Sequence, residues 1–129
     1  MAGILAIGKP VFADAVCDGG TGVSMTGVES APWSVQIEFG PNGVPLSQPF
    51  GASVTICSES GQLPTRIEVD ATMPAHKHGM NYDARTTRID DRKYKVENLL
   101  FHMPGVWQLE VTTYKDGTPH RFTRDLTIP

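Results

Sequence analysis

Apolar and polar side chains alternate along most of this chain. Alternation with a period of two is typical of a strand that buries one face. The clearest stretch is residues 105–114, whose pattern predicts an inward face of Trp107, Leu109 and Val111. Gln108 and Glu110 lie between these residues and are predicted to point outward. No segment of the sequence shows a sustained period of 3.6 residues, so the pattern predicts strands and not helices.

Seven strands are predicted in this way, with turn residues between them. Their ranges are 33–39, 50–57, 65–72, 84–89, 93–97, 105–114 and 121–128. Ten prolines and thirteen glycines punctuate the chain, and Asp116-Gly117 is typical of a tight hairpin turn. We therefore predict an all-β fold, an antiparallel immunoglobulin-like β-sandwich of about seven strands. A small closed barrel would show the same pattern and is the alternative.

The 129 residues are enough for one domain with a hydrophobic core and too few for two. We expect residues 32–129 to form the sandwich and the glycine-rich residues 16–31 to be irregular, tied down by Cys17. Residues 1–15 contain an apolar run followed by Ala13-Asp-Ala15, small residues of the kind signal peptidases require, and are predicted to be an export signal. No Lys or Arg precedes the run, and the alternative is an apolar strand of a cytosolic protein.

The two cysteines, Cys17 and Cys57, bear on the compartment. In an oxidising compartment their expected product is one disulfide. The alternative is a pair of buried free thiols, since free cysteine is also a common core residue. Together with the N-terminal pattern, the predicted disulfide indicates a periplasmic or secreted protein.

Composition argues against several classes of function. The net charge of −3 provides no basic surface for nucleic acid. After the N-terminal run, no stretch approaches the roughly 20 apolar residues that span a bilayer, so stable membrane insertion is not expected. The sequence contains no Ser/His/Asp order, paired-carboxylate motif or phosphate-binding glycine loop that would indicate catalysis. We therefore predict that the protein is not an enzyme.

Histidine and methionine are concentrated in one part of the chain. Three of the four histidines and three of the five methionines lie within residues 73–103. They form two motifs, Met73-Pro-Ala-His-Lys-His-Gly-Met80 and Phe101-His-Met-Pro-Gly105. Two predicted antiparallel strands separate the motifs, and an even number of strands returns the chain to the same edge of the sheet. The sequence therefore predicts a cluster at one edge, made of His76, His78, Met80, His102 and Met103.

The atoms of this cluster indicate copper. Imidazole nitrogen suits copper and zinc, whereas thioether sulfur is a soft donor that favours Cu(I). Calcium and magnesium take oxygen ligands, and zinc more often combines histidine with cysteine or carboxylate. Neither motif contains an acidic residue. We predict that three or four of the five residues bind a single Cu(I) or Cu(II) ion. The alternative is that the methionines pack the core and the histidines are solvated.

The segments Glu68–Tyr82 and Leu99–Leu109 resemble the small exported domains of the YtkA-like and FixH-like group. The resemblance covers roughly residues 32–128 and depends on the paired motifs. It implies an immunoglobulin-type sandwich and a role in copper handling or respiratory-oxidase assembly. It also implies that the same five His and Met residues are the functional positions. The membrane helix of FixH proteins has no counterpart in these 129 residues.

These observations predict a periplasmic or secreted copper-binding accessory protein. In this hypothesis the His/Met loops bind a copper ion and deliver it to an exported partner protein, in oxidase or cytochrome assembly. The alternative is a metal-free exported module that docks a partner enzyme or cytochrome through the same loops.

Overall fold

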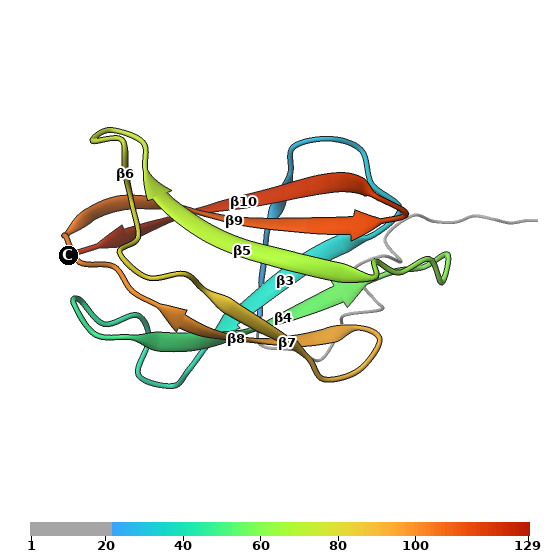
Figure 1. Cartoon of the computed structure of the whole chain (residues 1–129), viewed down its shortest axis with the longest axis horizontal. Coiled ribbons are helices and arrows are strands. Elements are labelled where there is room, and N and C mark those ends of the chain that lie inside the picture. The colour runs from blue at the N-terminus through green and yellow to red at the C-terminus, as the bar shows by residue number, and fades with distance from the viewer. Residues whose placement is uncertain (1–21) are drawn as a thin grey trace, which may run out of the picture.

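Two antiparallel β-sheets pack face to face in this protein (Figure 1). The computed structural model describes residues 22–129, in which each sheet has five strands. One sheet has the order β1 (Val23–Ser24), β3 (Ser34–Phe39), β4 (Phe50–Cys57), β8 (Lys93–Leu99) and β7 (Arg85–Arg88). The other has the order β2 (Thr26–Gly27), β10 (Thr118–Ile128), β9 (Gly105–Lys115), β5 (Arg66–Met73) and β6 (His78–Gly79). The fold is an all-β sandwich, which confirms the predicted fold class.

The seven predicted strands correspond to β3, β4, β5, β7, β8, β9 and β10. The structure adds three strands of two residues each, β1, β2 and β6. Two of them lie in the segment predicted to be irregular, so that prediction was wrong for residues 23–24 and 26–27. Between them, buried Met25 donates its N–H to Val35 O. The chain therefore crosses from one sheet to the other at Met25.

The core lies between the inward faces of the two sheets. Trp107, Leu109 and Val111 are fully buried, whereas Gln108 and Glu110 are half-buried on the outer face. The predicted orientation of this strand is therefore confirmed. β5 alternates just as strictly, and it buries Ile67, Val69, Ala71 and Met73. Among residues 22–129 no helix is long and apolar enough to cross a membrane.

Two successive hydrogen bonds link Trp33, Thr113 and His120 at one end of the sandwich. Trp33 Nε1 donates to Thr113 Oγ1 at 3.0 Å, and Thr113 Oγ1 donates to His120 O at 3.0 Å. Cys57 is buried near this end, and within the described part of the chain no cysteine is free. Cys17 and the predicted export signal lie outside the described residues, so the Cys17–Cys57 disulfide stays a prediction.

The other end of the sandwich is formed by three connections. These are the β3–β4 loop (40–49), the segment from β5 through β6 to β7 (74–84), and the β8–β9 loop (100–104) (left side of Figure 1). The pairing of Phe50 with Leu99 places the end of the first connection beside the start of the third. The pairing of Thr72 with Gln108 brings the second connection beside the start of β9. Both His/Met motifs therefore lie at this end.

Candidate functional site

The first His/Met loop is a tight reversal between β5 and β6. Met73 pairs with His78 across the two strands, so four residues make the turn. The His76 N–H donates to Met73 O at 3.1 Å. Lys77 has a φ of 56°, in the left-handed region that few non-glycine residues adopt and that helps the chain reverse here. The turn brings the ring centres of His76 and His78 to 6.0 Å from each other.

The second His/Met loop is fixed on both sides of His102. Before it, the carbonyl oxygen of buried Phe101 accepts a hydrogen bond of 2.8 Å from Ser47 N–H, in the β3–β4 loop. After it, Met103 O accepts a hydrogen bond of 2.9 Å from Trp107 Nε1. The rings of Phe101 and Trp107 are stacked with centres 4.8 Å apart. This loop is therefore held against the core by both backbone and aromatic contacts.

The two loops meet at their histidines. The ring centres of His78 and His102 are 6.3 Å apart, in an edge-on arrangement. The His102 ring also packs edge-on against Trp107, at 5.5 Å between ring centres. His76 and His78 are exposed, whereas His102 is half-buried. The prediction that strand parity brings the two motifs to one edge is therefore confirmed.

His102 carries a buried polar atom without a partner. Its Nδ1 atom is shielded from solvent and has no hydrogen-bond partner. Buried polar groups in folded proteins are almost always paired, and an exception calls for an ion, a water molecule or a functional reason. The structure leaves this nitrogen without a bond, as it does Nδ1 of His120 at the other end of the sandwich.

Met80 and Met103 lie at the inner margin of the same loops. Both side chains are half-buried and pack against the hydrophobic core. Among the described residues, no three or more His, Cys, Asp or Glu side chains are grouped to hold a metal ion. Two imidazoles that share one ion at about 2 Å from each nitrogen have ring centres roughly 5–6 Å apart. The two ring-centre distances, 6.0 and 6.3 Å, lie at the upper end of this range or just beyond it, so a site here needs the rings to move closer and thioethers to complete the donor set.

Comparisons with known proteins provide no relative from which a function for this site could be inferred. No family model, curated protein or solved structure matches this chain. The resemblance to the YtkA-like and FixH-like group therefore stays a prediction that rests on the two motifs. The donor atoms in the two loops are the imidazoles of three histidines and the thioethers of Met80 and Met103.

Two neighbours of the histidines were not among the predicted site residues. Met73 is 1% exposed and lies directly across from His78. Gly105 has a φ of 131°, and a Cβ atom placed on it would lie 2.7 Å from the Met73 methyl carbon. Met73 begins the first motif and Gly105 ends the second. Neither the alternation of the strands nor the spacing of the motifs could show that these two residues are in contact.

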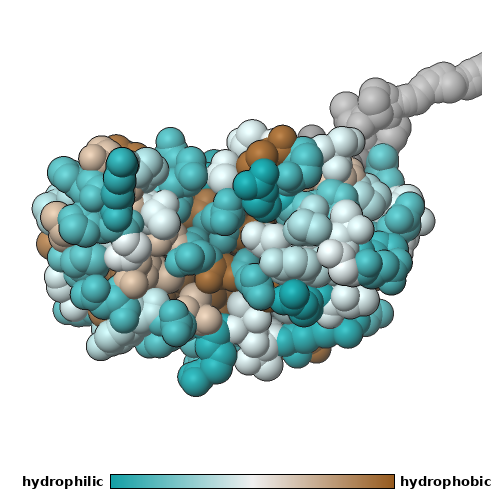
Figure 2. All heavy atoms as spheres, turned by 45° about the horizontal axis from the view of Figure 1, so that its top comes forward, coloured by the Kyte–Doolittle hydropathy of each residue, from teal (hydrophilic) through white to brown (hydrophobic). Residues whose placement is uncertain are grey.

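The end of the sandwich that carries the histidines is poor in charge. The loops at residues 40–49 and 100–104 contain no charged residue, and residues 74–84 contain only Lys77 and Asp83. Three large apolar side chains are exposed on or beside these connections: Leu46, Tyr82 and Val106. Figure 2 shows apolar side chains reaching the surface between hydrophilic ones, mostly in the left half of that view. This end of the sandwich therefore carries little charge and three of the five large apolar side chains that are exposed among the described residues.

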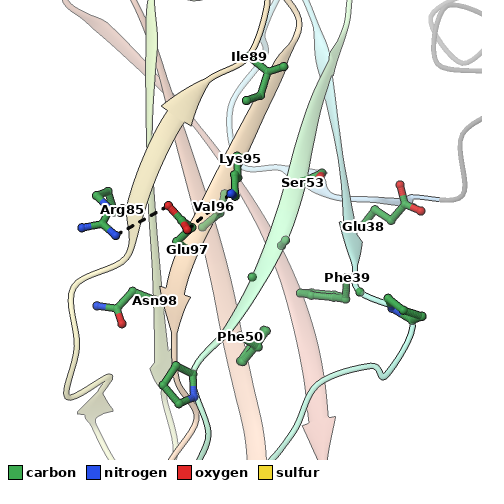
Figure 3. Close-up of a pocket in the computed structure, with 15 residues that line it drawn as sticks. Glu38, Phe39, Phe50, Ser53, Arg85, Ile89, Lys95, Val96, Glu97 and Asn98 are labelled. Carbon is green, nitrogen blue, oxygen red and sulfur yellow. Dashed lines mark ion pairs between the residues drawn. The ribbon is translucent and has the colours of Figure 1, made fainter.

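A groove of about 870 Å³ lies on the outer face of the sheet formed by β3, β4, β8 and β7 (Figure 3). Phe39 and Phe50 line one end of it, with ring centres 6.1 Å apart. On the other side Glu97 forms ion pairs with Arg85 at 3.8 Å and with Lys95 at 3.6 Å. The charges along the groove therefore pair with one another. No histidine or methionine lines the groove, which makes it a feature separate from the His/Met loops.

Proposed function

We propose that this protein is an exported copper-binding accessory protein, which holds one copper ion between its two His/Met loops and delivers it to a partner protein. The observation that carries the proposal is the meeting of His78 and His102, at 6.3 Å between ring centres. These histidines come from segments that two strands separate. A His-x-His turn alone is weak support, but its contact with a second His/Met loop is the arrangement that a shared ion requires.

The donor set favours copper over other metals. Imidazole and thioether together suit copper, because thioether sulfur binds Cu(I) and competes poorly for hard cations. Zinc sites more often add cysteine or carboxylate, and the two motifs contain neither. The exposed pair His76 and His78 suits Cu(II), which imidazole binds well. The half-buried thioethers of Met80 and Met103 suit Cu(I).

The position of the loops supports delivery of the metal. His76 and His78 are exposed at the end of the sandwich, where a second protein can reach an ion that they bind. The surroundings are apolar and nearly uncharged, which is typical of the centre of a protein interface. A site of this kind suits an accessory protein that exchanges copper with a partner.

The two thioethers are expected to determine affinity for Cu(I). We predict that the double variant Met80→Leu with Met103→Leu binds Cu(I) at least about tenfold more weakly, because losing a ligand should cost no less than losing an outer-shell partner. Affinity for Cu(II) should change much less, since imidazoles carry that binding. Competition with a coloured chelator measures both affinities.

Met25→Leu is the matched control for this pair. Met25 is buried between β1 and β2, and leucine nearly conserves its volume, so copper affinity should equal that of the parent. Equal Cu(I) affinity in the Met80/Met103 double variant and in the parent would show that the thioethers are core packing and not ligands.

A second candidate function is a metal-free module that docks an exported enzyme or cytochrome through the same loops. The exposed side chains of Leu46, Tyr82 and Val106, with the scarcity of charge around them, favour this reading. Docking surfaces are depleted in charge and enriched in aromatic residues and methionine at their centre. Under this reading the protein binds its partner without capturing copper.

A further inference from the structure

We propose that the contact between Met73 and Gly105 sets the spacing of the two His/Met loops, so that both are positioning residues for the metal site. The inference rests on the proposed function and extends it to two residues outside the predicted ligand set. The contact joins the last residue of β5 to the first residue of β9, and one His/Met loop begins or ends at each of them.

Met73 is linked to the first loop through both its backbone and its side chain. Its carbonyl oxygen accepts the 3.1 Å hydrogen bond from His76 N–H, and its backbone pairs with that of His78. Its side chain is 1% exposed and ends against Gly105. A displacement of Met73 is therefore transmitted directly to the turn that holds both exposed histidines.

Gly105 is linked to the second loop. It follows His102 and Met103 by three and two residues, and it pairs with Ile128 as the first residue of β9. Its φ of 131° is one that L side chains rarely adopt, and a Cβ atom here would lie 2.7 Å from the Met73 methyl carbon. The methyl group of Met73 thus occupies space that exists because residue 105 is glycine.

A side chain at position 105 would strain the backbone, because of the positive φ, and would also overlap Met73. The atom it meets is the end of a flexible side chain, so the overlap is relieved when Met73 moves and the sheets need not separate. Met73 is buried, however, and its backbone pairs with that of His78, so a shift of Met73 reaches the strand that carries His78. The expected result is a folded protein in which His78 and His102 no longer have the spacing that one ion requires.

The test compares Gly105→Ala with Gly117→Ala in the full chain. Gly117 also has a positive φ, of 80°, but its Cβ position has no atom within 4 Å and it lies in the β9–β10 turn at the opposite end. Chelator competition should show copper binding at least about tenfold weaker for Gly105→Ala, the lower range for lost outer-shell support. Gly117→Ala should bind copper like the parent.

A double-mutant cycle separates positioning from general destabilisation. In a His102→Ala background, the substitution Gly105→Ala should weaken copper binding no further, because the spacing it disturbs involves His102. An equal loss of affinity in both backgrounds would overturn the inference, as would parental affinity in Gly105→Ala.

A metal-free measurement tells failure of this inference from failure of the proposed function. In NMR spectra without metal, contacts between the ring protons of His78 and His102 should be present in the parent and in Gly117→Ala, and lost in Gly105→Ala. If the parent captures no copper but the ring contacts follow this pattern, the proposed function is wrong and the loop-spacing role stands. If Gly105→Ala keeps the ring contacts, the inference is wrong whatever the metal does.

Discussion

Replacing Trp107 with alanine is expected to lower the free energy of unfolding by about 3–5 kcal/mol, the usual cost of removing a large buried aromatic side chain. Trp107 has no exposed surface and lies on β9, with β5 on one side and β10 on the other. Its ring stacks on Phe101 at 4.8 Å, and its Nε1 donates to Met103 O at 2.9 Å. Alanine would leave a cavity in the core and an unpaired carbonyl in the second His/Met loop.

Urea denaturation measures this loss as a lower midpoint with an unchanged slope. Val106→Ala is the matched control, because its side chain is 47% exposed one residue earlier on the same strand. The control should change the free energy of unfolding by no more than about 0.5 kcal/mol, as is usual for surface positions. A loss below about 1 kcal/mol for Trp107→Ala would mean that the packing around β9 is wrongly described.

The double variant His76→Ala with His102→Ala is expected to abolish copper binding and to leave the domain folded. It removes one imidazole from each loop and leaves His78 as the only imidazole among the five predicted ligands. His76 is exposed, and His102 is half-buried at the rim of the sandwich, so their truncation costs little core packing. Chelator competition with Cu(I) and Cu(II) measures the binding, and denaturation confirms the fold.

His120→Ala is the control for this double variant. It removes the fourth histidine, which lies at the other end of the sandwich with its ring 5.4 Å from that of Trp33. This variant should keep the copper affinity of the parent. Parental affinity in the His76/His102 double variant would show that the two loops do not share an ion.

The long strands could be predicted from the sequence because each buries one face. In β5 and β9 this leaves a period of two over eight residues or more. The strands β1, β2 and β6 have two residues each, which is too short for any period, and they form only by pairing with the edge of an existing sheet. Their positions depend on tertiary structure, so local pattern could not reveal them.

The meeting of the two His/Met motifs could also be predicted, since it follows from counting antiparallel strands. The details of the site could not. The unpartnered Nδ1 of His102 depends on how its ring packs against Trp107. The contact of Met73 with Gly105 depends on β5 and β9 being neighbours in one sheet. Side-chain packing between segments distant in sequence leaves no trace in spacing or composition.

Titration of the whole protein with Cu(I) against a coloured chelator tests most directly whether the two loops bind one copper ion. The experiment is done without oxygen and repeated with Cu(II). The proposed function predicts that the protein withholds one copper ion per chain from the chelator. If it withholds neither Cu(I) nor Cu(II), the copper proposal is contradicted, and the metal-free docking module is the function that the loops support.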